Sequence, residues 1–148
     1  MYRHILIPTD GSELANKAVA HGLSLAKSVG AKVTVLTIEA SFNVYDVPPS
    51  KMSKMSSVFA EYAEHAKEHA AQILSKVADT AKAAGVPCGT VQLIQDRPYE
   101  AIVATAKEKG CDLIVMASHG RKGIAAMVIG SVTTKVLTHT DIPVLVCR

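Results

Sequence analysis

The chain has 148 residues, of which 49% are hydrophobic, 20% are charged and only 4% are aromatic, and its formal net charge is +3. This length and balance predict a single domain over residues 1–148 with an aliphatic core, and they exclude a disordered or fibrous chain. Because there is no tryptophan and the basic residues are interspersed with acidic ones, we expect neither nucleic-acid binding nor membrane binding.

The cysteines and the apolar runs indicate a cytoplasmic protein. Cys88, Cys111 and Cys147 are far apart and form no CxxC pair, which fits a reducing compartment. No apolar run approaches the length of a membrane span. Since Ile5–Ile7 already has the character of a strand, we also expect no leader segment before the fold.

The first part of the chain predicts a strand, a helix and a second strand. The strand at Ile5–Ile7 is expected to end before Pro8–Gly11, which favours a turn. Ser12 is then a natural N-cap for a helix whose apolar residues recur at helical spacing as far as Gly30. The β-branched run Val33–Ile38 is typical of a second strand.

The middle of the chain predicts a long exposed loop followed by a long helix. Residues 40–57 lose all periodicity and contain Pro48 and Pro49, so we expect the least ordered part of the domain there. From Phe59 small apolar residues recur at helical spacing as far as Gly85, which favours a helix packed closely on a sheet.

The last part of the chain continues the alternation. Val91–Ile94 alternates with polar residues and is predicted to be an edge strand, and Pro98 opens a helix that ends near Gly110. Leu113–Met116 is apolar throughout and is predicted to be a central strand.

A glycine-rich loop, a helix over Ser131–His139 and a strand at Pro143–Val146 complete the predicted elements. Strands that alternate with helices imply right-handed crossovers and a parallel sheet. We therefore predict an α/β fold: one doubly wound, Rossmann-like open sheet of five parallel strands with helices on both faces.

Two segments that follow predicted strands form the candidate site, since ligands of such sheets bind beyond the carboxyl ends of the strands. The first is Pro8–Ser12, and the second is Met116–Gly123, which leads on to Gly130–Val132. The N–H groups and partial positive charge of a helix N-terminus attract phosphate.

Within the second segment, Gly130 would let the backbone approach a phosphate oxygen and Ser131 would cap the helix and donate to phosphate. Arg121 and Lys122 would add positive charge, and Gly120 and Gly123 would allow the turns of the loop. Each feature has a plainer interpretation: Gly-Ser before a helix is ordinary capping chemistry, and Asp10 can serve only as an Asx-turn residue.

The motif Ala117-Ser118-His119-Gly120, nine further residues and Gly130-Ser131 resembles the ATP-binding signature of the universal stress protein family. The opening Ile5–Ser12 and the ending Asp141–Val146 resemble that family's first and last strands, so the resemblance covers the whole chain. The family pattern has glycine where this chain has Ala117. Alanine there would distort the loop if a positive φ is needed, and would be a small obstruction if the glycine serves only closeness to the ligand.

The resemblance implies a nucleotide site around ATP, with Mg²⁺ or Mn²⁺ held mostly by phosphate and water. It implies that Asp10 binds ribose or a metal-bridged phosphate and that Pro8, Thr9 and Ile38 line the adenine and ribose pocket. His119 and Arg121 are added as phosphate partners from their place in the loop. The candidate binding residues are Pro8, Thr9, Asp10, Ile38, Met116, Ala117, His119, Gly120, Arg121, Gly130, Ser131 and Val132.

The resemblance further implies a homodimer formed through the last strand, Val144–Val146. It also implies a stress-response or regulatory role that is exerted by binding. The residues do not identify the protein partner. Two alternatives remain open: a dimeric interaction module of the same fold that binds no nucleotide, and a slow ATP hydrolase. The absence of a GxxxxGK[ST] P-loop and of GxGxxG argues against fast ATPase and dinucleotide chemistry.

Other candidate sites have plainer explanations. His65 and His69 lie one helical turn apart, but the surrounding residues are typical of a solvated helix face and provide no third metal ligand. Ser118 and Ser131 lack a GxSxG elbow, and His119 lacks an orienting partner. Cys111 is predicted to be a structural thiol, since nothing near it would lower its pKa.

Overall fold

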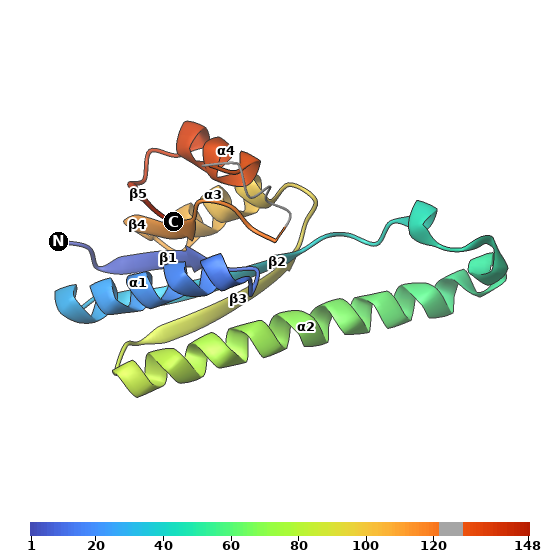
Figure 1. Cartoon of the computed structure of the whole chain (residues 1–148), viewed down its shortest axis with the longest axis horizontal. Helices are drawn as coiled ribbons and strands as arrows, with labels where there is room; N and C mark the ends of the chain where they lie inside the picture. Colours follow the sequence, from blue (N-terminus) through green and yellow to red (C-terminus); the bar gives the residue numbers. More distant parts are fainter. Residues whose placement is uncertain (122–128) are drawn as a thin grey trace.

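The computed structural model describes residues 1–121 and 129–148. Its strands and helices alternate along the chain (Figure 1). In chain order they are β1 (His4–Pro8), α1 (Glu13–Val29), β2 (Lys32–Glu39), two short 3₁₀ turns (Val44–Asp46 and Pro49–Lys54), α2 (Met55–Ala84), β3 (Cys88–Ile94), α3 (Pro98–Glu108), β4 (Leu113–Ala117), α4 (Ser131–His139) and β5 (Val144–Cys147).

The five strands form one parallel sheet in the order β3-β2-β1-β4-β5. The chain moves outward from β1 to β2 and β3, then returns to the other side of β1 to form β4 and β5. The strand order therefore reverses between β1 and β4, which makes their carboxyl ends the switch point of an open α/β sheet. The predicted five-stranded parallel fold is confirmed.

The central strands are buried on both sides, which explains their continuous apolar sequences. Ile5, Leu6 and Ile7 of β1 are fully buried, and every residue of β4 is buried. β3 lies at one edge of the sheet, and its residues are exposed or half-buried, with none of them buried. The predictions of a central strand at Leu113–Met116 and of an edge strand at Val91–Ile94 are confirmed.

Helices cover both faces of the sheet. On one face, residues of α1 and α2 such as Leu23 and Leu74 pack with Ile5, Ile7 and Val35 of the strands. On the other face, α3 and α4 pack against the opposite side of the strands. This second core contains Ile102, Ala106 and Val136 of the helices and Leu6, Leu36, Ile114 and Met116 of the strands. Successive strand residues alternate between these two cores, as the period of two requires.

The ends of the first helix follow the sequence prediction. The Ser12 side chain accepts a 3.2 Å hydrogen bond from the backbone N–H of Ala15, so it is the N-cap of α1. The helix ends at Val29, directly before Gly30. This cap fixes the direction in which the chain leaves the candidate site.

Two strand boundaries differ from the prediction. Pro8 belongs to β1 and is paired in register with Leu36, although the sequence analysis placed it in the turn. A proline at the end of a strand loses only a donor, and the chain regains its ladder at once because the N–H of Thr9 donates to the Leu36 carbonyl at 2.8 Å. Likewise β5 begins at Val144, after Pro143, and extends to Cys147.

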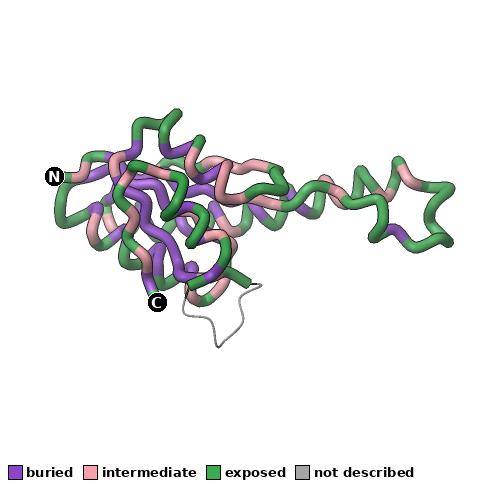
Figure 2. The backbone as a smooth tube through the Cα atoms, turned by 90° about the horizontal axis from the view of Figure 1, so that it is seen from above, coloured by how far each residue is buried: buried purple, intermediate pink, exposed green. Residues whose placement is uncertain are grey.

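The prediction that residues 40–57 form a loop without regular structure is wrong in part. The segment contains two 3₁₀ turns, and α2 begins at Met55, earlier than the predicted start at Phe59. The Asn43 side chain caps the first turn, and the ring of Phe42 packs edge-on against those of Phe59 and Tyr62, with centroids 5.3 and 5.4 Å apart. Most of the segment is exposed, as predicted, and with the start of α2 it extends beyond the sheet (Figures 1 and 2).

Candidate functional site

A cleft of about 660 Å³ lies at the carboxyl ends of the strands, around the switch point between β1 and β4. This volume is within the range of pockets that hold small organic ligands. Its wall includes all the candidate binding residues that the sequence analysis named: Pro8, Thr9, Asp10, Ile38, Met116, Ala117, His119, Gly120, Arg121, Gly130, Ser131 and Val132. The fold therefore brings the two predicted loops to the same cavity.

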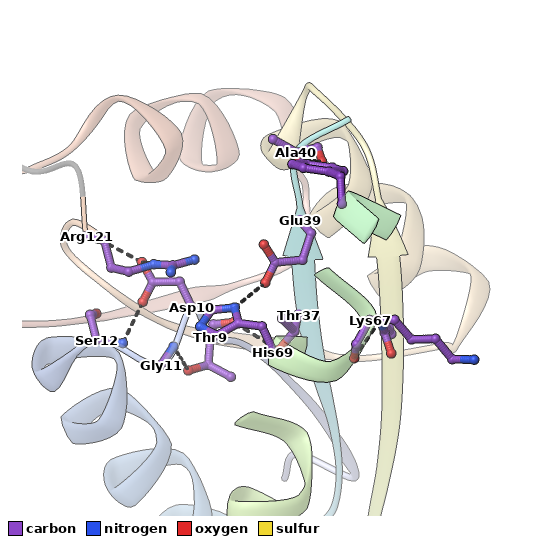
Figure 3. Close-up of polar contacts among 12 residues, drawn as sticks. Thr9, Asp10, Gly11, Ser12, Thr37, Glu39, Ala40, Lys67, His69 and Arg121 are labelled. Carbon is purple, nitrogen blue, oxygen red and sulfur yellow. Dashed lines mark hydrogen bonds and ion pairs between the residues drawn. The ribbon is translucent and has the colours of Figure 1, made fainter. Parts of the chain in front are cut away.

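Asp10 joins the two loops across the cleft. Its Oδ1 accepts a 2.9 Å hydrogen bond from the backbone N–H of Ser12, and its Oδ2 accepts a 2.8 Å hydrogen bond from the backbone N–H of Arg121. The Arg121 guanidinium Nε lies 4.0 Å from the same Oδ2 (Figure 3). The Asx-turn interpretation of Asp10 is thus correct but incomplete, since the same side chain also positions the segment after β4.

These contacts lower the pKa of Asp10. Burial of the carboxyl group acts to raise its pKa, but hydrogen bonds from Ser12 and from the Arg121 backbone, with the positive charge of Arg121, outweigh it. The net shift is below the ordinary aspartate value. Asp10 is therefore ionised at neutral pH and contributes a fixed negative charge to the cleft.

Ala117, which departs from the family pattern, has an ordinary strand backbone. It is the last residue of β4, and no non-glycine residue in the described ranges has a positive φ. Its carbonyl accepts a 2.9 Å hydrogen bond from the Thr133 hydroxyl. The sequence analysis gave two possible effects of alanine here. The first, distortion because a positive φ is needed, is excluded. The second remains: the Ala117 methyl group is a small obstruction at the wall of the cleft.

The two described glycines of the motif are required by close approach rather than by backbone conformation. A Cβ added at Gly120 would lie 2.5 Å from Asp10 Oδ2. A Cβ added at Gly130 would lie 3.1 Å from the His119 Cα and 3.2 Å from the Ser118 carbonyl oxygen. The N–H of Gly130 donates to that same oxygen at 2.6 Å. Gly130 therefore packs the start of α4 onto the end of β4, a role that sequence reasoning did not assign to it.

The N-terminus of α4 opens toward the cleft without a side-chain cap. The N-cap residue is Gly130 and Ser131 is the first helical residue, so the expectation that Ser131 caps the helix is wrong. Ser131 is exposed, and in the described part of the chain its hydroxyl has no hydrogen-bond partner. Among the described residues nothing else binds this hydroxyl or the N–H groups of the first turn, and such groups at a helix N-terminus attract anions.

His119 lies beside these donors and contacts Ser118. Its Nδ1 is 3.2 Å from the Ser118 hydroxyl oxygen, and Ser118 itself is buried. Within residues 1–121 and 129–148 no carboxylate orients the His119 ring. Lys122 and Gly123, which the sequence analysis placed in the same loop, lie outside the described residues.

Sequence reasoning missed one part of the cleft wall. Glu39 and Ala40 at the end of β2, Tyr62 of α2, and Gln95 and Asp96 after β3 also line the cavity. Tyr62 donates a 2.7 Å hydrogen bond to the Ala40 carbonyl, which ties α2 to the end of β2. The position of Gln95 and Asp96 directly after a strand was a usable signal, but the sequence alone does not place Tyr62 beside them.

The residues that the sequence analysis set aside as sites have the following surroundings in the structure. His69 pairs with Glu39, and in the described ranges no group of three His, Cys, Asp or Glu side chains gathers as a metal site. Burial raises the pKa of the Cys111 thiol to about 11, as expected for a structural cysteine.

No helix in the described residues has the length and apolar character needed to cross a bilayer.

Comparison with known proteins identifies relatives along the whole chain. Universal stress protein MJ0531 of Methanocaldococcus jannaschii is 32% identical over 148 residues, which cover 100% of this chain and 83% of the relative. Universal stress protein YxiE of Bacillus subtilis is 30% identical, and the match covers 100% of each chain.

Solved structures share the fold at full length. Hypothetical protein MJ0577 of Methanocaldococcus jannaschii superimposes with a TM-score of 0.82 at 26% identity, covering 99% of this chain and 96% of the other. A universal stress protein in complex with cAMP superimposes with a TM-score of 0.70 at 25% identity, covering 99% and 97%. The family model of the universal stress protein family matches residues 1–148. The chain therefore belongs to the universal stress protein family.

Proposed function

We propose that this chain is a nucleotide-binding stress protein that holds ATP in the cleft between β1, β2 and β4 and acts by binding rather than by rapid turnover. The observation that carries the proposal is the meeting of the Asp10 turn and the Gly130–Ser131 helix start at one cleft at the switch point. The structural relative in complex with cAMP, which is 25% identical over nearly the whole chain, supports nucleotide binding at this fold.

The phosphates would lie at the α4 end of the cleft. The first turn of α4 presents N–H groups and the Ser131 hydroxyl, and the Arg121 guanidinium and His119 ring line the same wall. A helix N-terminus carries about half a positive elementary charge, which favours phosphate binding even without a lysine that contacts the phosphates. The absence of a P-loop is therefore compatible with binding.

The base and ribose would lie along the apolar part of the wall. Leu36, Ile38, Met116 and Val132 give this part its aliphatic surface, and Pro8 and Thr9 border it. The Asp10 carboxylate accepts hydrogen bonds from two backbone N–H groups and has lone pairs left over. It would use one of these to accept a hydrogen bond from a ribose hydroxyl.

Mg²⁺ or Mn²⁺ would enter with the nucleotide. Asp10 is a hard oxygen ligand at the cleft, and no cluster of three ligating side chains occurs in the part of the chain that the structure describes. The donor set thus suits an ion held mainly by phosphate and water. Such an ion would neutralise phosphate charge beside Asp10.

We also propose a homodimer through β5 and a cytoplasmic location. Leu145 lies in the middle of an edge strand with 41% of its surface exposed, and edge strands with apolar side chains favour pairing with another chain. The competing interaction module without nucleotide loses support, because the backbone at Ala117 does not have the positive φ that would require glycine there. Slow ATP hydrolysis remains the second candidate function. His119 lines the cleft and could act as a base, but no carboxylate in the described residues orients its ring, so hydrolysis would be slow.

The proposal is tested by calorimetric titration of the nucleotide-stripped protein with ATP and Mg²⁺, alongside adenosine as a matched ligand without phosphates. Saturable binding of ATP with much weaker binding of adenosine is expected, because the α4 N-terminus recognises phosphate. Failure of ATP, ADP and AMP to bind the folded protein would overturn the proposal. Release of inorganic phosphate measured in the same samples separates binding from hydrolysis.

A further inference from the structure

The proposed function gives no role to Glu39, a carboxylate of the cleft wall. Glu39, the last residue of β2, lines the cleft, and its side chain is only 15% exposed. Its Oε1 accepts a 2.8 Å hydrogen bond from Nδ1 of His69, which reaches it from α2 (Figure 3). An acidic side chain held in this way at a cavity wall presents a fixed acceptor to whatever occupies the cavity.

The charges of the cleft are separated along its length. The α4 N-terminus, Arg121 and His119 lie after β4, whereas Glu39 ends β2 and Asp96 follows β3. In Figure 3 Asp10 lies between Arg121 on one side and the Glu39–His69 pair on the other. Carboxylates repel phosphate, so a nucleotide with its phosphates at α4 turns its base toward the end of β2.

The chemistry of Glu39 restricts which base edge it can meet. An ionised carboxylate accepts hydrogen bonds and donates none. In the described residues Oε2 of Glu39 has no hydrogen-bond partner, while Oε1 is occupied by His69. A base that presents an N–H donor gains a charge-assisted hydrogen bond there, and a base that presents a carbonyl oxygen meets like charge.

We infer that Glu39 is a specificity-determining residue of the cleft that selects a purine with an amino group on its six-membered ring over one with a carbonyl group at the same position. His69 is a positioning residue that holds the Glu39 carboxylate toward the cavity. The inference rests on the proposed nucleotide function and adds to it the residue that reads the base.

ATP and ITP form the matched pair that tests the inference, because they differ at that position: adenine has an amino donor and hypoxanthine a carbonyl acceptor. Dissociation constants for the two nucleotides with Mg²⁺ are measured by calorimetry on the full-length wild-type protein. We expect ATP to bind more tightly on the order of ten-fold, the scale of one charge-assisted hydrogen bond.

Glu39→Gln is expected to reduce this ratio to within about three-fold, because the amide offers a donor as well as an acceptor. Asp96→Asn is the matched control: it removes the same charge from the same region of the wall, where Asp96 is bound to the backbone N–H of Ser41. It should raise the affinity for both nucleotides alike and leave their ratio unchanged. Glu39→Asp provides a second variant if Glu39→Gln fails to fold. It keeps the charge but shortens the side chain by one methylene, so it should also lower the ATP-to-ITP affinity ratio.

The positioning role is tested separately on α2. His69→Phe keeps a planar ring but removes the hydrogen bond to Glu39, and it should lower the ATP-to-ITP ratio without abolishing ATP binding. His65→Phe is the control, because His65 lies one turn earlier on the same exposed helix surface and does not line the cleft. A purely structural role of His69 would change thermal stability and leave the ratio as it is.

The outcomes distinguish the inference from the function on which it rests. If the wild-type protein binds neither nucleotide, the proposed function fails and the inference fails with it. If it binds ATP but the ratio is the same in wild type, Glu39→Gln and Asp96→Asn, the cleft binds nucleotides and the inference alone is overturned. A ratio that falls in the Glu39 variants and His69→Phe, and not in the controls, supports it.

Discussion

Asp10 and Arg121 lie 111 positions apart in the chain, and the backbone N–H of Arg121 donates a 2.8 Å hydrogen bond to Oδ2 of Asp10. The bond fixes the segment after β4 against the turn after β1. The shape of the α4 end of the cleft therefore depends on an aspartate at the other end of the sequence. Because glycine at position 120 allows this approach, the motif glycine and the acidic turn act together.

Asp10→Asn tests this link. The amide retains one acceptor oxygen for Ser12 or Arg121 but presents N–H groups in place of the second, so one of the two backbone bonds is lost. We expect ATP affinity to fall on the order of ten-fold, the scale of one hydrogen bond to a charged group. Calorimetric titration measures the change, and wild-type affinity in the variant would show that the link has no part in binding.

The low pKa of Asp10 predicts an acid-dependent loss of stability. Because its pKa in the folded state lies below the unfolded value, its contribution is complete above the unfolded pKa of about 3.9 and disappears as the pH falls through the folded pKa. The unfolding temperature of wild type should therefore drop more between about pH 5 and about pH 3 than that of Asp10→Asn. Parallel curves in scanning calorimetry would contradict the assignment.

Ser131→Asp separates binding from folding. Aspartate in the first turn of α4 interacts favourably with the helix dipole and should stabilise the protein by about 0.3–1 kcal/mol, yet its charge repels phosphate. We expect ATP binding to weaken by at least about ten-fold while the unfolding temperature stays the same or rises. Thr138→Asp, at the exposed far end of the same helix, is the control and should leave ATP affinity unchanged.

Gly120→Ala tests the close approach at Asp10. The added methyl would lie 2.5 Å from Oδ2, so the carboxylate must rotate away from Arg121, which weakens ATP binding at a small cost in stability. The control is Gly89→Ala on β3, where an added methyl meets only the Thr34 hydroxyl oxygen at 4.0 Å. Equal ATP affinity in the two variants would contradict the role of Gly120. Gly130→Val is a poorer probe, because its side chain would meet the backbone of Ser118 and His119.

Leu145→Glu tests the proposed dimer. Leu145 is 41% exposed on the edge strand β5, and a charge there disfavours pairing with a second copy. Sedimentation is expected to show a dimer for wild type and a monomer for the variant. An unchanged dimer would place the interface elsewhere.

Local signals in the sequence determined the elements and much of the site. The unbroken apolar run Leu113–Met116, the cap at Ser12 and the stop at Gly30 depend on neighbours within a few residues, so each was predictable from its own segment. The rule that ligands bind beyond the carboxyl ends of parallel strands then selected the loops after β1 and β4. Together these signals predicted the parallel fold and identified residues that line the cleft.

The tertiary structure alone decided how those residues are held and which others join them. Gly130 was predicted to admit phosphate, but it also packs against Ser118 and His119, and residues 40–57 form 3₁₀ turns held by contacts of Phe42 with α2. His69 meets Glu39 from 30 positions away. Periodicity and capping describe interactions within one element, whereas these contacts join residues of different segments that only the packing of α2 and α4 against the sheet brings together.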